Sequence, residues 1–411
     1  MQTNSNKKKI INDPVYGFVN ITSGLIFDII EHPVFQRLRR IKQLGLSNLV
    51  YPGALHTRFQ HVIGAMSLTD QAVEVLRSKG IEITADEKDA VCAAVLLHDI
   101  GHGPFSHTLE EVLIKNVHHE QLSLAFMHML NEEFEGRLGK CIQIFQNEYH
   151  KKFLHQLVSS QLDMDRLDYL RRDSFYTGVQ EGVIGHDRII NMLNVYNDEL
   201  VMEEKGIYSI EKFLIARRLM YWQVYLHKTV TAAETILVKV MKRASELAAD
   251  GVELFASPDF KYFLYEKPGP EQLLNDPEVL MRYSRLDDSD VFVSIKVWCS
   301  HADKILSDLC MQLRDRHLPR IEFSNDAFDE NRISEMRKEF ALKNNISFED
   351  AKYYIFTDSV SNKAYSPEGF NIKILYKNGT TADIASASDQ YNITALAKPV
   401  TKYFLCYPKF V

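Results

Sequence analysis

The sequence VCAAVLLHDIGHGPFSH, at residues 91–107, decides how the whole chain is interpreted. Its first seven residues are apolar and predict a helix that is buried nearly all round, and this helix ends in the pair His98–Asp99. Burying an ionised Asp99 costs several kcal/mol unless something compensates, and a bound cation would do so. Gly101 and Gly103 then break the helix and let the backbone approach whatever His98 and Asp99 hold.

The length and charge of the chain limit its class. It has 411 residues, of which 45% are hydrophobic, and a formal net charge of −7. This length allows a large core and predicts one larger and one smaller domain. The negative charge gives no overall attraction to nucleic acid or to anionic membranes, so neither is an expected partner.

The N-terminus and the cysteines indicate the cellular compartment. The first residues, MQTNSNKKK, are polar, and no run of eighteen apolar residues occurs, so we expect a cytoplasmic protein with no membrane contact. The 5 cysteines are scattered without a CxxC pair. We therefore expect reduced, structural cysteines.

Helices are predicted to dominate the first two thirds of the chain. Residues 7–21 predict a short ribbon with a turn at Asn12-Asp13-Pro14. A capping box from Thr84 to Glu87 predicts the start of the central helix. Apolar periodicity predicts further helices over residues 31–43, 61–77, 110–130, 151–172 and 209–251, the first of them basic and amphipathic.

Strand-like runs are concentrated toward the C-terminus. A hairpin is predicted over residues 200–210, turning at Lys205-Gly206, and the composition changes near residues 267–270. Strands are predicted at 291–298, 353–360 and 371–384, the last with a turn at Asn378-Gly379, and a helix at 303–316. We predict a mainly α protein, with a helical domain and N-terminal ribbon over residues 1–266 and a smaller C-terminal α+β region over residues 267–411.

Four residues are the candidate ligands of a metal ion: His61, His98, Asp99 and Asp165. Two imidazoles and two carboxylates form a mixed nitrogen and oxygen site that suits Mn, Fe, Mg, Zn or a similar divalent ion. Such an ion lowers the pKa of bound water and polarises a phosphoryl oxygen, so the pattern indicates a hydrolase. For any single residue of the four, the alternative is a buried structural role satisfied by hydrogen bonds.

The order of these motifs resembles a known family. The pattern H…HD…D with HDIGHGPFSH is similar to that of the HD-domain phosphohydrolases. INDPVYG, FQRLRRIKQLG, YPGALHTRFQHVIG, HHEQLS, DMDRLDYLRRD and, less closely, RLDDSDVFVSIKVW resemble the deoxynucleoside triphosphate (dNTP) triphosphohydrolases across most of the chain, without a sterile-alpha motif. The resemblance implies a helical HD core. It also implies metal-dependent hydrolysis of a dNTP at the α-phosphorus, which releases deoxynucleoside and inorganic triphosphate.

The resemblance also implies roles for individual residues. His61, His98, Asp99 and Asp165 would bind the metal, and His119 would be the acid or base at the ester bond, oriented by Glu110. His102 would face the phosphates beside the metal. The substrate-binding residues would be Gln43, Arg58, His107, Arg166, Tyr169, Asp173, Arg217 and Tyr221. The arginines would clamp the triphosphate, because guanidinium groups match phosphate oxygens in pairs.

A second nucleotide site is implied at subunit contacts of a homo-oligomer, either a dimer or a tetramer, to which the C-terminal region would contribute. GTP or a dNTP would bind there as an activator. The residues would be Lys9, Asn12, Glu31, Gln36, Arg39, Arg188, Arg316, Arg320 and Lys398. The alternative for these residues is ordinary surface charge.

Two other functions fit the same motifs. One is an HD-family phosphatase or phosphodiesterase that acts on another nucleotide, which the released products would distinguish. The other is a nucleotide-sensing protein without catalysis, which would bind tightly and release no products.

Overall fold

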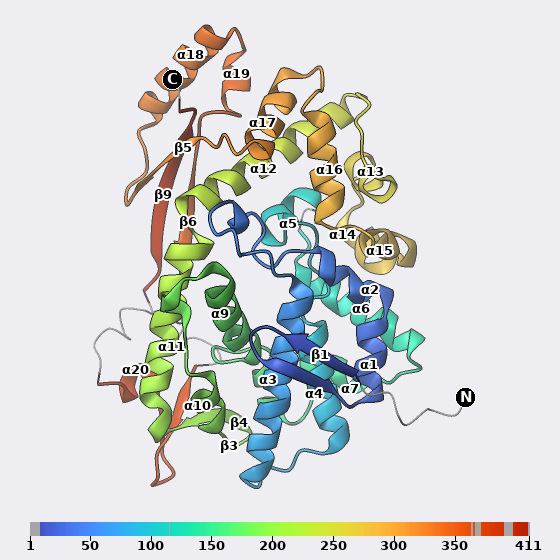
Figure 1. The fold of residues 1–411 in the computed structure, drawn as a ribbon, viewed down its shortest axis with the longest axis vertical. Coiled ribbons are helices and arrows are strands. Elements are labelled where there is room, and N and C mark those ends of the chain that lie inside the picture. Colours follow the sequence, from blue (N-terminus) through green and yellow to red (C-terminus); the bar gives the residue numbers. More distant parts are fainter. Residues whose placement is uncertain (1–8, 115, 363–364, 366–370, 390–397, 410–411) are drawn as a thin grey trace.

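The computed structural model describes residues 9–409, except 115, 363–364, 366–370 and 390–397, and except the side chains of His107, Glu111 and Leu113. Helices dominate this part of the chain, and small sheets lie beside them (Figure 1). The predicted class, mainly α with a smaller α+β region toward the C-terminus, is confirmed.

The elements follow one another in three groups. The first contains β1 (Lys9–Asp13), β2 (Gly17–Ile21), α1 (Gly24–Glu31), α2 (Pro33–Gln36), η1 (Arg37–Arg40), η2 (Ser47–Leu49), α3 (Arg58–Ser78), α4 (Ala85–Leu97), α5 (His107–Leu113), α6 (His119–Glu133), α7 (Gly139–Phe145), α8 (Lys152–Val158) and α9 (Met164–Thr177). The second contains η3 (Gln180–Gly182), α10 (His186–Asn191), β3 (Leu193–Tyr196), β4 (Glu199–Glu203), η4 (Glu204–Gly206), α11 (Ile207–Met220), the π-helical turn η5 (Tyr221–Tyr225), α12 (Lys228–Ala249) and α13 (Pro258–Tyr265). The third contains α14 (Pro270–Asn275), α15 (Pro277–Tyr283), α16 (Asp288–Trp298), α17 (Lys304–Arg314), β5 (Arg320–Ser324), α18 (Glu330–Asn344), α19 (Phe348–Ala351), β6 (Phe356–Asn362), β7 (Lys373–Leu375), β8 (Thr381–Asp383), α20 (Ile384–Ala387) and β9 (Val400–Tyr407).

Helix α4 is the centre of the helical core. It is buried along its whole second half, from Ala90 to Leu97, as the apolar sequence predicts. The predicted capping box is present, because Thr84 N donates to Glu87 Oε2 at 2.7 Å and Glu87 N donates to Thr84 Oγ1 at 3.2 Å. Helix α3 packs against both α4 and α9, so these three helices meet where their functional residues lie (Figure 1).

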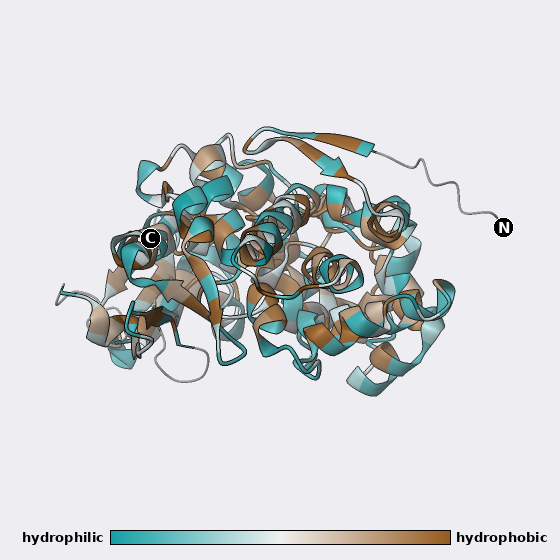
Figure 2. Cartoon of the chain, turned by 90° about the horizontal axis from the view of Figure 1, so that it is seen from below, coloured by the Kyte–Doolittle hydropathy of each residue, from teal (hydrophilic) through white to brown (hydrophobic). Residues whose placement is uncertain are grey.

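The predicted N-terminal ribbon is the antiparallel hairpin β1–β2, paired from Lys9↔Ile21 to Asp13↔Gly17. Val19 and Ile21 pack into the core, while alternate residues on the other face, such as Phe18, are exposed. In Figure 2 this hairpin lies along one edge of the molecule with hydrophobic and hydrophilic residues alternating along it. The period of two residues explains why the sequence predicts this element correctly.

Two sheets accompany the helices, with strand orders β3-β4-β7-β8 and β5-β9-β6. Strand β4 pairs in parallel with β7, so the first of these sheets contains strands from both sides of residue 266. The antiparallel pair β7–β8 confirms the hairpin predicted over residues 371–384, and Gly379 in its turn has φ +81. The domain division at residues 266 and 267 remains a prediction.

The segment 291–298 is not the predicted strand but most of helix α16. Asp287 caps this helix, since its carboxylate accepts from Ser289 N at 2.9 Å while Asp290 Oδ2 accepts from Asp287 N at 2.8 Å. Val291, Ile295 and Trp298 are buried at helical spacing. The β-branched residues of this segment favour a strand, but the acidic N-cap and the packing against α17 stabilise a helix instead.

The predicted hairpin turn at Lys205-Gly206 is also wrong. The hairpin is β3–β4, which turns at Asn197-Asp198, where both residues have positive φ (+51 and +62). Asn and Asp tolerate this conformation better than other residues do. Residues 204–206 instead form η4, which leads into α11.

Several predicted helices are interrupted. Residues 31–43 are not one amphipathic helix, because the chain breaks at His32-Pro33 and continues as α2 and η1. The predicted helices over 110–130, 151–172 and 209–251 are each divided in two, the last by the π-helical turn η5. Those predicted over 61–77 and 303–316 are confirmed as α3 and α17, and the strand predicted at 353–360 is β6, shifted toward residue 362.

All 5 cysteines are free and buried, as predicted. Among the helices of the described residues, none combines the length and the apolarity that a membrane crossing needs.

Candidate metal centre and active site

The four predicted metal ligands converge at one point at the wall of a cavity. His61 Nε2 on α3 lies 2.9 Å from Asp165 Oδ1 in the first turn of α9. His98 Nε2, at the end of α4, lies 3.3 Å from Asp99 Oδ1 and 3.5 Å from Asp165 Oδ1. His61 Nε2 and Asp99 Oδ2 are 3.8 Å apart. Three helices therefore bring two imidazoles and two carboxylates together.

Hydrogen bonds on the outer nitrogen of each imidazole fix the ring orientation. His61 Nδ1 lies 2.7 Å from Asp168 Oδ2, and His98 Nδ1 lies 2.5 Å from the carbonyl oxygen of Val95. A carboxylate and a carbonyl can only accept, so both Nδ1 atoms carry the proton. Both Nε2 atoms therefore face the cluster, where each would offer its lone pair to a metal ion in exchange for a proton, as metal-ligating histidines do.

The cluster fits a divalent cation. His61 Nε2 and His98 Nε2 are buried and make no hydrogen bond among the described residues. His61, His98 and Asp99 each offer a ligand atom within 4.8 Å of the others. Buried, unpaired nitrogen lone pairs beside carboxylates are costly unless a cation or proton binds. HD-type proteins depend on metal, and this chain has the His and Asp residues to hold one.

Electrostatics in the cluster favour positive charge. Burial lowers the pKa of His61, but the neighbouring carboxylates of Asp165 and Asp168 outweigh it and raise the pKa to about 10. Burial likewise lowers the pKa of His98, but the negative charge of Asp99 outweighs it and the pKa rises to about 9. Burial raises the pKa of Asp165, but His61 and His98 hold it well below its usual range.

The two glycines after the HD pair serve helix packing. A Cβ at Gly101 would lie 2.2 Å from the carbonyl oxygen of His119, and one at Gly103 would lie 2.5 Å from Tyr283 Oη. The close neighbours are thus α6 and α15, while the expectation that this turn also lets the backbone approach a ligand remains a prediction. The close packing places His119 next to the HD pair.

His119 has the geometry of a general acid or base. Its Nδ1 lies 3.0 Å from Glu110 Oε1, and its backbone N donates to the same oxygen at 2.7 Å. Its ring lies 3.8 Å from that of His102, centroid to centroid, and His102 Nε2 is 3.6 Å from Asp99 Oδ1. The structure therefore brings His119, Glu110 and His102 together beside Asp99, one of the candidate metal ligands.

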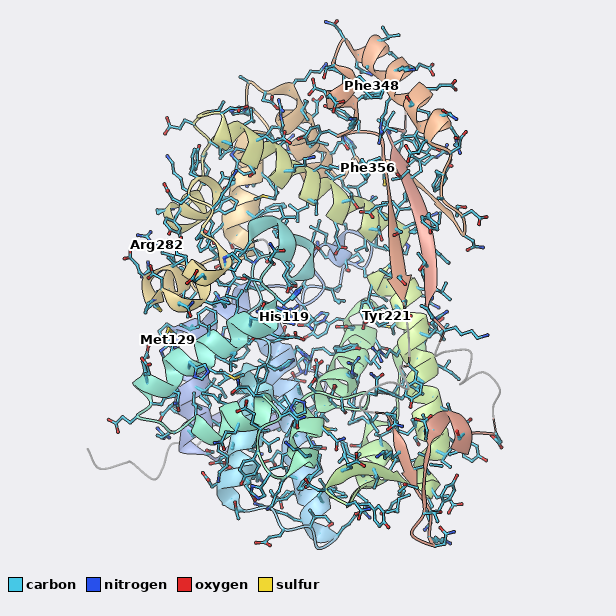
Figure 3. All side chains as sticks on the ribbon, turned by 180° about the vertical axis from the view of Figure 1, so that it is seen from behind. His119, Met129, Tyr221, Arg282, Phe348 and Phe356 are labelled. Atoms are coloured by element: carbon cyan, nitrogen blue, oxygen red, sulfur yellow. The ribbon has the colours of Figure 1, made fainter. Side chains whose placement is uncertain are left out.

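A cavity of about 960 Å³ opens beside the cluster. This volume lies in the range of ligand-binding clefts. In Figure 3, His119 and Tyr221 point toward the middle of the molecule from different elements, and both line the cavity. The predicted site residues that line it are Gln43, Arg58, His98, Asp99, His102, His119, Asp165, Arg166, Tyr169, Asp173 and Tyr221.

Three predicted residues lie behind this lining. His61 is fully buried, and Glu110 does not line the cavity but contacts His119, which does. Arg217 Nη1 lies 3.5 Å from Gln161 Oε1, and its guanidinium is 5.9 Å from the Tyr221 ring. The side chain of His107 lies outside the described residues.

The arginines of the cavity already have protein partners. Arg58 Nη1 pairs with Asp99 Oδ2, and Arg58 Nε donates to Ser106 Oγ at 2.9 Å. Arg166 Nε donates to the carbonyl oxygen of Ser160 at 2.7 Å and to Asp163 Oδ2 at 3.1 Å. These bonds hold each guanidinium in one orientation at the cavity wall.

Two further residues orient Asp173. His56 Nε2 lies 2.7 Å from Asp173 Oδ1, and Tyr225 Oη donates to Asp173 Oδ2 at 2.8 Å. The Tyr169 ring packs 6.1 Å from that of Tyr225, and Tyr169 Oη is buried without a hydrogen-bond partner among the described residues. Tyr169, Asp173 and Tyr225 all line the cavity, so this part of its wall combines a carboxylate with aromatic rings.

The sequence analysis missed several carboxyl groups that line the cavity, among them Glu234 on α12. Burial raises its pKa to about 7, against a smaller opposing effect of a hydrogen bond with Thr108. The sequence did contain a signal for this residue, because Glu234 is an acidic residue among the apolar and small residues at the start of α12. Asp358 and Phe404, from the C-terminal sheet, line the same cavity and had no signal in the sequence.

The predicted activator residues separate into two groups. Asn12 and Arg39 line a pocket of about 220 Å³, Arg39 Nε donates to Gln36 Oε1 at 2.8 Å, and Lys9 pairs with Glu31 close by. None of the remaining four, among the residues described, lines this pocket: Arg188, Arg316, Arg320 and Lys398.

The fold and the site define the class as a metal-dependent hydrolase. Residues 58–173 match the model of the HD domain, and residues 184–263 match that of the HD associated region. The chain belongs to the HD-domain phosphohydrolase family.

Three similar proteins illustrate this membership. A phosphohydrolase from Bacteroides thetaiotaomicron VPI-5482, known from a crystal structure, is 54% identical, with a TM-score of 0.94 over 98% of this chain and 100% of that one. The protein YwfO of Bacillus subtilis (strain 168) is 33% identical over 98% of this chain and 93% of its own length. A deoxynucleoside triphosphate triphosphohydrolase, the SAMHD1 homolog of Dictyostelium discoideum, is 31% identical over 58% of this chain and 50% of its own length.

Proposed function

We propose that this protein hydrolyses deoxynucleoside triphosphates to deoxynucleosides and inorganic triphosphate. The observation that carries the proposal is the composition of the 960 Å³ cavity. It is lined by candidate metal ligands, a histidine held by a carboxylate, cationic guanidinium groups, and the carboxylate of Asp173 among tyrosine rings. The likeness to the Dictyostelium enzyme, which carries this activity in its name, supports the choice of substrate.

The chain's own residues would divide the work of the reaction. Arg58 and Arg166 bind the triphosphate, and Gln43 and Asp173 bind the deoxyribose hydroxyl. Tyr169 packs against the sugar, where a 2′-hydroxyl would have to displace its ring. Because both ends of the substrate are held, its α-phosphorus lies beside the candidate metal ligands. Positioning of this kind is a large part of phosphoryl-transfer catalysis.

His119 would protonate the leaving group. Glu110 holds His119 Nδ1, which leaves Nε2 as the nitrogen that can exchange a proton with the substrate. Water attacks the α-phosphorus and releases a proton to the solvent, the bond to the 5′-oxygen breaks, and the departing oxygen takes the proton from His119, which the solvent then reprotonates. A divalent ion held by His61, His98, Asp99 and Asp165 would supply a more acidic water and polarise the phosphoryl oxygen.

We extend the proposal to regulation and assembly. The pocket beside Asn12 and Arg39 would bind an activating nucleotide, GTP or a dNTP. Arg188, Arg316, Arg320 and Lys398 do not line that pocket within one chain, so they would complete it from a neighbouring subunit of a dimer or tetramer.

The test is product analysis with the purified chain. Each of the four dNTPs is incubated with Mn²⁺ or Mg²⁺, with and without GTP, and the products are separated by ion-exchange chromatography. We expect inorganic triphosphate and deoxynucleoside, and a loss of rate of roughly 10²–10⁴-fold in His119→Ala. The matched control is His128→Ala, since His128 lies on the same helix but is exposed.

Other products would identify the rival functions. Release of orthophosphate, or opening of a diester, would replace the proposal with a phosphatase or phosphodiesterase. Tight nucleotide binding without products under every condition would indicate a nucleotide-sensing protein instead.

A further inference from the structure

A buried chain of charged groups connects the N-terminal hairpin to the metal centre. Asp13, the last residue of β1, accepts a hydrogen bond from Arg172 Nη1 at 2.7 Å. Arg172 donates from Nε to Asp168 Oδ2 at 2.9 Å and from Nη2 to Asp168 Oδ1 at 3.0 Å. Asp168 Oδ2 in turn lies 2.7 Å from His61 Nδ1. Three side chains thus join the hairpin to the far side of a metal-binding imidazole.

The charged groups that link the hairpin to His61 are buried away from water. Asp168 and Arg172 are fully buried, and Asp13 is 6% exposed. The Tyr16 ring covers the guanidinium of Arg172 at 5.5 Å. Helix α3 has a glycine at the crossing, Gly64, where a Cβ would lie 2.1 Å from Asp168 Oδ1 and 2.2 Å from Arg172 Nη2. Charges in such a place interact strongly, because little water screens them.

The two oxygens of the Asp13 carboxylate accept hydrogen bonds from different parts of the structure. Its Oδ1 accepts from Val15 N at 2.8 Å and from Tyr16 N at 3.0 Å, which fixes the turn of the hairpin. Its Oδ2 receives the guanidinium of Arg172. The position of the hairpin and the position of the guanidinium are therefore set by the same side chain.

We propose that Asp13 is a positioning residue of the metal centre, which acts on the ligand His61 through Arg172 and Asp168. With Asp13 in place, the positive charge of Arg172 is shared between two carboxylates, and Asp168 keeps enough negative charge to strengthen the bond from His61 Nδ1. A stronger bond there makes His61 Nε2 a better donor to a metal and holds its ring in place. This proposal depends on the metal centre alone and goes beyond the proposed substrate.

The test measures metal binding directly in the full chain. Asp13→Asn is nearly isosteric and keeps an oxygen for the turn, but it presents an amide in place of the charged oxygen that receives Arg172. Mn²⁺ is titrated and followed by electron paramagnetic resonance, and Co²⁺ is titrated and followed by visible absorption. We expect Asp168→Asn to weaken Mn²⁺ binding by about 10–100-fold and Asp13→Asn, one partner further away, by about 3–10-fold. The Co²⁺ absorption bands should shift in both.

The matched control is Val19→Ala, which removes apolar packing from the same hairpin without touching the chain of charges. It should lower the unfolding midpoint but leave the Mn²⁺ dissociation constant within about twofold and the Co²⁺ bands unchanged. An unchanged constant and spectrum in Asp13→Asn would overturn the proposal, as would equal weakening in Val19→Ala. If Asp13→Asn does not fold, Arg172→Lys is the deciding variant. Lysine keeps the charge but has no planar guanidinium, so it cannot reproduce the paired bonds to Asp168 together with the bond to Asp13. Unaltered Mn²⁺ binding in this variant would equally overturn the proposal.

Discussion

At the scale of single residues, Glu234 makes stability depend on pH. Its pKa in the folded chain is about 7, raised by burial from the ordinary value of 4.5. A raised carboxyl pKa means that the folded state favours the neutral form. The resulting stabilisation is fully present below pH 4.5 and is lost as the pH rises through about 7.

We therefore predict that Glu234→Gln flattens part of the pH dependence of unfolding. From this one group, the free energy of unfolding should fall by about 3 kcal/mol between pH 4.5 and 8, since each pK unit corresponds to about 1.4 kcal/mol. The glutamine variant lacks this fall and should be the more stable protein at pH 8. Urea unfolding at pH 5 and pH 8 measures both values.

Glu253→Gln is the control, because the Glu253 side chain is 89% exposed. It should change stability by the same small amount at both pH values. If the two variants behave alike, burial of Glu234 does not govern its titration.

At the scale of elements, the crossing of α3 over α9 depends on the missing side chain of Gly64. A methyl group there would overlap Asp168 and Arg172, neither of which can move without losing a buried partner. We predict that Gly64→Ala lowers the free energy of unfolding by about 2–3 kcal/mol, as overpacking does. Urea unfolding at a single pH measures the loss.

Gly24→Ala is the matched control for this element. Gly24 begins α1, and a Cβ at this position would have nothing within 4 Å, so alanine should be neutral or stabilising by up to about 1 kcal/mol. Equal stability of Gly64→Ala and the wild type would show that the two helices separate more easily than the contacts indicate.

At the scale of the whole molecule, the helical core and the C-terminal region share structure. Strand β4 pairs with β7, and Asp358 and Phe404 line the same cavity as the candidate metal ligands His98, Asp99 and Asp165. Shared sheets and a shared cavity favour one cooperative transition. We predict that residues on both sides of position 266 unfold together.

The chain offers two convenient reporters, because it has only 2 tryptophans. Trp222 lies in η5 and Trp298 in α16, so Trp298→Phe and Trp222→Phe each leave one reporter on one side. Within each variant, the fluorescence midpoint in urea should coincide with the midpoint from far-ultraviolet circular dichroism. Separate midpoints in either variant would show that the two parts unfold independently.

Much of the site is predictable from the sequence because its signals are local. The capping box at Thr84, the apolar run of α4 and the adjacent pair His98–Asp99 each depend on neighbours within a few residues. The spacing of charged residues in α9 likewise marks Asp165. The resemblance of the ordered motifs supplied the remainder, including His119 with Glu110.

The sequence by itself determined the mainly α class, the central helix and the residues that could bind a metal. The tertiary structure decided which distant groups meet: Asp13 with Arg172, Glu234 with the cavity, and β4 with β7. It also decided that residues 291–298 form a helix. The physical reason is that propensities and caps act over a few residues, whereas the pairing of buried charges and the packing of a helix depend on partners that only the folded chain brings within reach.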